Sequence, residues 1–424
     1  MNLNRSISVA LIGARMHYAV PRILNHAGVL ERLYTDISID HGIVSLLNKI
    51  PGMDKFTAFR RIKGRHVEGV KNELITAFEL IGFKYSIKLK IARTSEERTA
   101  AYLWVADEFA RSIKKCGLGM IDSIYGFNGA SLGIFVEAKS RGISTILEQT
   151  SAPKRIELEI LSRQKTRDDE SNNCLDGNLN EFIKREELEW DTADSILCAS
   201  DFVRTGLIRC GVPAHKCTVI PYGVDLARFK TSKPKYLTKE FKKNKSITVL
   251  FIGSVRTQKG IWTLLAAMRD LQDASIECRV IGPIVTDNVA LTNACPSNVK
   301  IVGPIPRSEI SGELHRADIF CLPSLCEGSA TVIYEALAAG LPVVTTNNSG
   351  SIVRHGHEGL IVDADDKEQL AQALLQLATD YEMRYAMSQS AIERSEFGSF
   401  SAYSDRLIEA LKITPATNLG IACV

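Results

Sequence analysis

The chain has 424 residues, of which 45% are hydrophobic and 24% are charged, and its formal net charge is +3. This length exceeds what one hydrophobic core usually organises, so we expect two domains, and the small net charge argues against general nucleic-acid binding. The ten cysteines include no Cys-x-x-Cys pair, which argues against metal and redox motifs and indicates reduced cytoplasmic thiols. The sequence has no signal-peptide pattern and no apolar run of membrane-spanning length, so we expect a cytoplasmic protein.

The first predicted strand, Ile7 to Gly13, is followed by a helix that has Pro21 as its expected first residue. In a doubly wound α/β sheet the loop between them lies at the carboxyl edge, where ligands bind. Gly13, His17 and Tyr18 are therefore candidate ligand contacts. For His17 the alternative is a solvated loop side chain.

Residues 49–115 are basic, with 15 Lys and Arg against 8 Asp and Glu. Within them, Ile87, Leu89 and Ile91 alternate with two lysines. One interpretation is a solvated protein face. The other is a peripheral contact with anionic lipid headgroups, which attract basic side chains.

From Ile121 onward, short apolar strands alternate with helices. Asn128 follows the strand that ends near Tyr125, and Glu148 follows the strand Ile143 to Leu147. Both residues fall at the predicted carboxyl edge of the sheet, so both are candidates for the acceptor side of a substrate site. The polar segment 163–180 is expected to be a surface loop.

A second α/β series begins at Ile247, after an expected interdomain hinge at residues 219–225. Its first strand leads through the loop 253–260 into a helix, and Lys259 at the end of that loop is suited to a phosphate. Further strands are expected at residues 279–281, 299–302, 319–322, 343–345 and 360–362, and a last helix at residues 400–412. This alternation predicts a second doubly wound domain.

The most informative stretch, residues 327–344, reads Glu-Gly-Ser-Ala-Thr-Val-Ile-Tyr-Glu-Ala-Leu-Ala-Ala-Gly-Leu-Pro-Val-Val. It predicts a loop, a helix that ends at Gly340, and a strand. We expect Ser329 or Thr331 to cap the helix. A helix that opens just after a strand offers free N–H groups and a positive dipole end to an anion. Glu327 precedes this helix and Glu335 lies inside it.

This stretch resembles the donor-binding signature of the family 4 glycosyltransferases, retaining enzymes of GT-B architecture, and residues 221–225 resemble the linker of that family. The resemblance implies two doubly wound Rossmann-like domains facing each other across a cleft. Residues 1–220 would form the acceptor-side domain and residues 221–399 the domain that binds the nucleotide-sugar donor. The helix in residues 400–424 would pack back on the N-terminal domain.

The resemblance also implies roles for individual residues. Glu335 would bind the ribose hydroxyls, Glu327 the hydroxyls of the donor sugar, and Lys259 the donor phosphates. The family has Arg where this chain has Ser254, so Arg256 is a candidate substitute. The predicted donor-binding residues are Gly13, Ser254, Arg256, Lys259, Gly282, Glu327, Gly328, Ser329, Ala330, Thr331 and Glu335. The predicted catalytic residues are Glu327, Lys259 and Glu148, and the acceptor-side residues are His17, Tyr18 and Asn128.

Asp363 and Asp365 form an Asp-x-Asp pattern like the metal motif of other glycosyltransferases, but their place between a strand and a helix indicates helix capping. We therefore expect no metal ion and no cofactor beside a UDP- or GDP-sugar co-substrate. The sequence predicts a retaining, metal-independent hexosyltransferase of polysaccharide or glycolipid biosynthesis, with a sugar, lipid-linked or small-molecule acceptor. Two alternatives stay open: a nucleotide-sugar epimerase of GT-B fold, and a non-catalytic nucleotide-sugar binder, which the loss of Arg at Ser254 favours.

Overall fold

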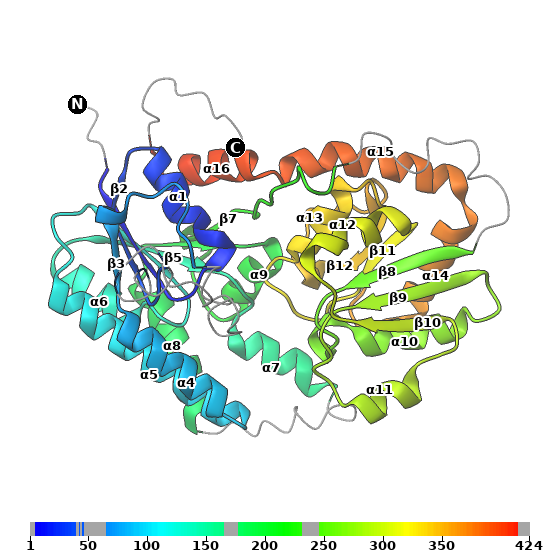
Figure 1. Cartoon of the computed structure of the whole chain (residues 1–424), viewed down its shortest axis with the longest axis horizontal. Helices are drawn as coiled ribbons and strands as arrows, with labels where there is room; N and C mark the ends of the chain where they lie inside the picture. Colours follow the sequence, from blue (N-terminus) through cyan, green and yellow to red (C-terminus); the bar gives the residue numbers. More distant parts are fainter. Residues whose placement is uncertain are drawn as a thin grey trace.

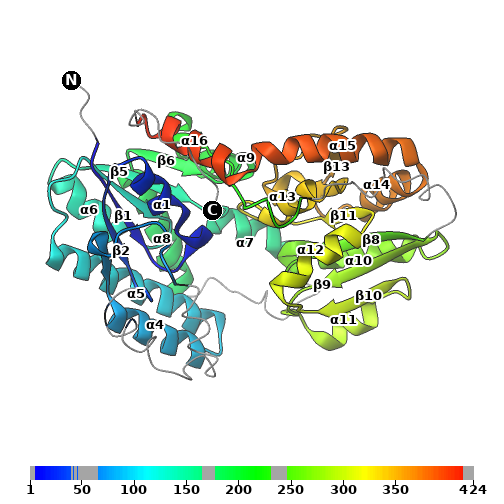
Figure 2. The same cartoon turned by 45° about the horizontal axis from the view of Figure 1, so that its top comes forward.

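The computed structural model describes residues 5–39, 42, 45, 65–164, 177–230 and 246–413. These residues form two α/β units, each built on one parallel sheet, which lie side by side in Figures 1 and 2. Helix α15 (Tyr381–Phe397) covers the C-terminal unit, and α16 (Phe400–Ala410) continues from it over the N-terminal unit. The structure is therefore a pair of Rossmann-like domains joined by two chain crossings, which is the fold that the sequence predicts.

The N-terminal sheet has seven strands in the order β3-β2-β1-β4-β5-β6-β7. They are β1 (Ile7–Leu11), β2 (Leu30–Thr35), β3 (Ile75–Ala77), β4 (Ser123–Phe127), β5 (Ser144–Gln149), β6 (Ser195–Cys198) and β7 (Cys217–Val219). Every residue of β1 and β4 is buried, as expected for strands covered by helices on both faces. The first strand ends at Leu11 rather than Gly13, and Pro21 is the third residue of α1 (Ala19–His26), still inside the first turn where proline is tolerated.

The other long helices of this unit are α4 (Glu79–Ile91), α5 (Ser95–Cys116), α6 (Leu132–Ser140), α7 (Lys154–Ser162), α8 (Gly177–Thr192) and α9 (Asp201–Arg209). The alternating Ile87, Leu89 and Ile91 thus belong to a helix, α4, which packs against α5. Among the helices in the described part of the chain, none combines the length and apolarity that a bilayer span requires.

The C-terminal sheet has six strands in the order β10-β9-β8-β11-β12-β13. They are β8 (Ile247–Ile252), β9 (Ile276–Ile281), β10 (Val299–Gly303), β11 (Ile319–Leu322), β12 (Val343–Thr346) and β13 (Gly359–Val362). The helices are α10 (Ile261–Asp270), α11 (Asn288–Ala294), α12 (Arg307–Arg316), α13 (Thr331–Ala338) and α14 (Lys367–Thr379). In this order β8 lies between β9 and β11, so the chain reverses its direction of winding at β8 and opens a crevice at its carboxyl end.

The two chain segments that cross between the units are joined by backbone hydrogen bonds. The Val224 N–H donates to the Gly398 carbonyl at 2.9 Å, and the Phe400 N–H donates to the Val224 carbonyl at 3.1 Å. Gly223 fits here because a Cβ atom would lie 2.6 Å from the Ser399 carbonyl oxygen, too close for any side chain. Beyond this junction, Tyr403 in α16 is buried in the core of the N-terminal unit.

Candidate active site

A cavity of about 430 Å³ opens at the carboxyl edge of the C-terminal sheet. Its walls come from the ends of β8 and β9, the loops after β10 and β11, and the first turns of α13. Eight of the eleven predicted donor-binding residues line it: Ser254, Lys259, Gly282, Glu327, Ser329, Ala330, Thr331 and Glu335. The structure therefore brings together residues that lie 81 positions apart in the chain, from Ser254 to Glu335.

Lys259 and Glu327 form an ion pair on the wall of this cavity, with side chains 19% and 15% exposed. Lys259 ends a 3-10 turn, and the next residue, Gly260, adopts a φ of 72° while its Cα faces the Pro323 carbonyl. Only glycine meets both demands, so the turn directs Lys259 into the cavity. The two residues expected to contact phosphate and sugar thus neutralise each other, and an incoming anion competes with Glu327 for Lys259.

The start of α13 differs from the prediction. Its N-cap is Ala330, and among the described residues no side chain caps it; Ser329 Oγ instead lies 3.1 Å from the Tyr334 hydroxyl. The prediction that Ser329 or Thr331 caps the helix is wrong, because the Ser329 side chain pairs with the Tyr334 hydroxyl inside α13 rather than with a backbone N–H. The backbone N–H groups of Thr331 and Val332, which line the cavity, therefore have no capping side chain among the described residues.

Glu335 lies one turn further along α13 and is paired with Arg307, the first residue of α12, at 3.1 Å. The Glu335 side chain is 8% exposed and that of Arg307 is 64% exposed. Burial raises the pKa of Glu335, and the nearby Arg307 opposes this shift. The sequence analysis missed Arg307, although its place just after β10 and a proline-rich loop is the same kind of signal that pointed to Lys259.

Glu148 does not face a substrate site. It is buried, and its two carboxylate oxygens accept hydrogen bonds from the Tyr125 hydroxyl at 2.5 Å and the Tyr222 hydroxyl at 2.7 Å. Burial raises the pKa of Glu148, and the two tyrosine hydrogen bonds oppose the shift. Because Tyr222 belongs to the linker, we correct the predicted catalytic role: Glu148 anchors the linker to strand β5.

The other N-terminal candidates are also engaged within the protein. Tyr18 is fully buried and donates to the Ile37 carbonyl at 3.2 Å, so the expected acceptor contact for Tyr18 is wrong. The Gly13 N–H donates to Asp36 Oδ1 at 2.9 Å, and Gly13 does not line the donor cavity. Asn128 Oδ1 accepts from the Thr150 N–H and hydroxyl at 3.1 and 2.9 Å, so it positions the Thr150 loop. His17 is exposed.

Gly328 joins the two units rather than lining the cavity. Its carbonyl accepts a hydrogen bond from Ser200 Oγ at 2.6 Å, and a Cβ atom on Gly328 would collide with the Thr150 carbonyl. Thr150 and Ser200 follow strands β5 and β6 of the N-terminal sheet. The glycine after Glu327 therefore lets the loop before α13 approach the edge of the N-terminal sheet, a role that the sequence analysis did not assign.

Arg256 and the two aspartates have structural partners. Arg256 Nε donates to Gln258 Oε1 at 2.7 Å, and Arg256 is absent from the cavity lining. Asp365 accepts from Thr263 Oγ1 at 3.0 Å and from Gln164 Nε2 of the N-terminal unit, while Asp363 accepts from Gln369 Nε2 at 3.1 Å. Among the described residues, no group of three or more His, Cys, Asp and Glu side chains is placed to hold a metal ion.

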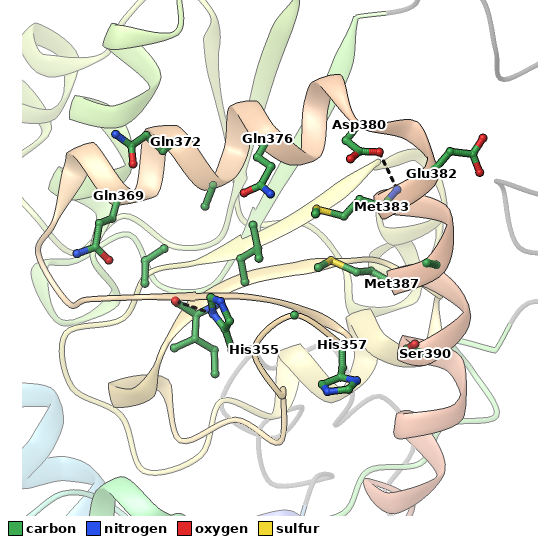
Figure 3. Close-up of a pocket in the computed structure, with 16 residues that line it drawn as sticks. His355, His357, Gln369, Gln372, Gln376, Asp380, Glu382, Met383, Met387 and Ser390 are labelled. Carbon is green, nitrogen blue, oxygen red and sulfur yellow. Dashed lines mark hydrogen bonds between the residues drawn. The ribbon is translucent and has the colours of Figure 1, made fainter.

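A larger cavity, of about 750 Å³, lies between β13, α14 and α15 (Figure 3). Glutamines of α14 and methionines of α15 line it, together with His355 and His357. No lysine or arginine is among the described residues that line this second cavity, and none of the predicted site residues is there. It therefore lacks the cations that a diphosphate requires.

Comparison with known proteins shows similarity in both sequence and fold. Residues 232–394 match the model of the family described as glycosyl transferases group 1. The whole fold resembles that of sucrose-phosphate synthase from Thermosynechococcus elongatus, with a TM-score of 0.66 at 16% identity, covering 96% of this chain and 98% of that one. The structural likeness shows that the chain has the GT-B fold, and the family match lies in the C-terminal unit, which holds the cavity of Lys259 and Glu335.

Two sequence relatives and a further solved structure are also similar to the chain. A putative teichuronic acid biosynthesis glycosyltransferase of Bacillus subtilis is 30% identical over 171 residues, which are 39% of this chain and 41% of the relative. A GDP-mannose-dependent phosphatidylinositol monomannoside mannosyltransferase of Mycobacterium tuberculosis is 27% identical over 220 residues, 48% of this chain and 57% of the relative. An Anabaena protein, HepE, solved with UDP, has a TM-score of 0.61 at 16% identity, covering 96% of this chain and 99% of that one. The chain thus spans about half the length of these two sequence relatives.

Proposed function

We propose that the protein is a retaining glycosyltransferase of family 4 that moves a sugar from a nucleotide-diphosphate sugar to an acceptor hydroxyl, in polysaccharide or glycolipid biosynthesis. The observation that carries this proposal is the donor cavity, where Lys259 and the uncapped start of α13 face the same space as the buried Glu335. A cation and free N–H groups suit two phosphates, and a carboxylate suits vicinal hydroxyls.

The ion pair between Lys259 and Glu327 suggests how donor binding frees Glu327 to contact the sugar. When the diphosphate enters, Lys259 exchanges a carboxylate partner for a phosphate oxygen. Glu327 is then free to accept hydrogen bonds from the sugar hydroxyls. Binding of the donor thus breaks one charge pair and forms two charge-assisted interactions, so neither charge is left buried without a partner.

In the proposed reaction the bond between the anomeric carbon and the phosphate oxygen breaks while the acceptor oxygen attacks from the same face. The acceptor proton passes to the departing phosphate oxygen, and the nucleoside diphosphate leaves. We assign no protein nucleophile, because Glu148 is buried behind two tyrosines. Lys259 and the N–H groups of α13 stabilise the negative charge that grows on the phosphate.

We propose further that the reaction needs neither a metal ion nor another cofactor, since Lys259 and the start of α13 supply the positive charge. Activity should survive an excess of EDTA after dialysis against the chelator. Complete loss of activity that magnesium or manganese restores would contradict this proposal and would direct attention back to Asp363 and Asp365.

On the acceptor side, we propose a peripheral contact between helix α4 and an anionic membrane at its cytoplasmic face. Leu80, Ile87 and Ile91 of α4 are 71%, 60% and 67% exposed. With Lys84 they follow the spacing i, i+4, i+7 and i+11, so they lie on one side of the helix. A mixed apolar and basic stripe suits a headgroup region, and a lipid-linked acceptor would be found there. The printed name of the Mycobacterium relative, which includes a phosphatidylinositol mannoside, agrees with this acceptor class.

A transfer assay tests the proposal. The protein is incubated with UDP- and GDP-sugars, with and without a lipid extract or a mixture of sugar acceptors. We expect release of a nucleoside diphosphate that depends on the acceptor, and a product with the anomeric configuration of the donor by NMR. Conversion of a donor alone into a new nucleotide sugar would indicate an epimerase instead. Binding of donors without any turnover would indicate a nucleotide-sugar binding protein.

A further inference from the structure

The donor cavity has two chemically different ends. Lys259 and the start of α13 make one end polar. Three apolar residues of the β10–α12 segment, Pro304, Ile305 and Ile310, line the wall together with Arg307. The guanidinium of Arg307 is the only cationic group among the described residues on this wall, and Lys259 is the only other lysine or arginine in the lining.

Glu335 fixes the order of these groups along the cavity. It follows Thr331, in the first turn of α13, by four residues, which is a rise of about 6 Å along a helix. Arg307 follows β10, which lies two strands away from β8, the strand that precedes Lys259, and it contacts Glu335 through Nη2. Away from the phosphate end, the charged groups therefore come in the order Lys259, Glu335, Arg307.

This order matches the order of phosphate, ribose and base in a nucleotide. The match rests on the proposed function, in which Lys259 binds the diphosphate and Glu335 the ribose hydroxyls. The base then falls beyond Glu335, where its faces meet Pro304, Ile305 or Ile310 and its edge meets the guanidinium of Arg307.

Arg307 is free to contact a base without leaving Glu335. Within the described residues it makes one hydrogen bond, through Nη2 to Glu335 Oε1. This bond uses one of the two N–H groups on Nη2 and leaves the other, paired with an N–H of Nη1 or Nε, for a ligand. Its side chain is 64% exposed, so a new contact requires little desolvation. The ion pair with the buried Glu335 restricts the Arg307 side chain, because the carboxylate holds the planar guanidinium through Nη2.

From this arrangement we infer that Arg307 reads the base and that the donor is a GDP-sugar. Guanine presents two adjacent acceptors, O6 and N7, whose spacing matches the arginine fork and allows two parallel hydrogen bonds. Uracil presents O4 beside an N–H donor, so it accepts only one of these bonds. Arg307 is thus a specificity-determining residue for the nucleotide.

Isothermal titration calorimetry with GDP and UDP tests this inference. We expect the native protein to bind GDP roughly tenfold or more tightly than UDP, the range of one bidentate arginine–guanine pair. Arg307→Gln should remove most of this preference by weakening GDP while UDP binding stays within about twofold. Arg316→Gln, at the other end of α12, is the matched control and should change neither affinity.

A nucleotide analogue separates base contacts from phosphate contacts. In 7-deaza-GDP a carbon replaces N7, so the native protein should bind it more weakly than GDP, and Arg307→Gln should bind the two alike. If Arg307→Gln weakens GDP and UDP equally, Arg307 serves the ribose or phosphates and the inference is wrong. If UDP binds more tightly than GDP, it is also wrong. If neither nucleotide binds, the proposed function itself fails, and this inference fails with it.

Discussion

Helices α6 and α13 both begin after a buried parallel strand and a loop, yet of these two helices only α13 leaves its N-terminus open. At α6, the buried Glu189 of α8 accepts hydrogen bonds from the N–H groups of Gly129 (2.6 Å), Ser131 (2.7 Å) and Leu132 (3.1 Å). At α13, within the described residues, no side chain occupies this position, and the first turn faces the donor cavity.

The comparison shows that local sequence creates an anion site but does not decide what fills it. The strand-loop-helix pattern gives both helices free N–H groups and a positive dipole end. At α6 the protein supplies its own carboxylate, from a residue 57 to 60 positions away in the chain. The N-terminal unit thus covers the start of α6 with its own carboxylate, and the C-terminal unit leaves the start of α13 facing the cavity.

The largest effect is expected at the open site. Lys259→Ala should lower kcat by about a hundredfold or more, because Lys259 faces the charge that develops on the leaving phosphate. The KM for the donor should rise less than kcat falls. Steady-state kinetics with Lys300→Ala, an exposed lysine of β10, as control would measure this. A change confined to KM would mean that Lys259 only binds the ground state.

Glu189, which covers the start of α6, should make the free energy of unfolding depend on pH. Burial raises the pKa of Glu189 to about 7, and the three backbone N–H groups oppose this shift. Since the folded pKa exceeds the unfolded value of 4.5, the stabilisation from protonated Glu189 is complete below about pH 4.5 and is lost as the pH rises through 7. This loss is on the order of 3 kcal/mol.

Glu189→Gln isolates that contribution, because glutamine does not titrate. Urea unfolding between pH 4.5 and 8 should show the free energy of unfolding of the native protein falling relative to that of the variant as the pH rises. The difference between the two proteins removes the contributions of other buried acids, such as Glu148 and Glu186, whose pKa values are also raised. A difference that does not change with pH would show that Glu189 stays ionised in the folded protein.

Glu335→Ala should weaken nucleotide binding by about ten- to a hundredfold, the cost of roughly 1.5–3 kcal/mol for lost charge-assisted hydrogen bonds. Calorimetry with UDP and GDP measures it. Glu382→Ala, in the larger cavity, is the control and should leave nucleotide affinity unchanged, since that cavity has no cation for a phosphate among its described lining residues. Equal affinities for the native protein and Glu335→Ala would remove Glu335 from the ribose site.

The smallest effect is expected on the outer face of the acceptor-side domain. Reversing the charges of Lys84 and Lys90 in α4 should weaken the free energy of binding to anionic membranes by about 1 kcal/mol for each residue at low salt. Less protein should then float with anionic liposomes. The same reversals at Lys300 and Lys367 of the donor-side domain should have less effect. If the native protein stays at the bottom of the gradient at low salt, α4 is not a membrane contact and the acceptor is soluble.

The sequence located neighbouring side chains best in the C-terminal unit, where eight of the eleven predicted residues line one cavity. There the chemistry-bearing residues sit on a strand, a short loop and a helix that follow one another in the chain, so Glu327, Ser329 and Glu335 are placed by local geometry. It failed for residues whose side chains find partners across the fold. Tyr18 and Glu148 do lie near the carboxyl edge of the sheet, as expected, but both are buried. Tyr18 donates to the Ile37 carbonyl, and Glu148 accepts from the linker residue Tyr222.

The sequence alone determined the alternation of strands and helices, because apolar periodicity and the glycine and proline stops act over a few residues. It also determined which loop carries Lys259 and which helix carries Glu335. Only the tertiary structure decided that Lys259 pairs with Glu327, that Arg307 reaches Glu335, and that Glu189 fills the start of α6. Each of these contacts joins residues 28 to 68 positions apart, and such distances are set by how sheets and helices pack, which no local pattern records.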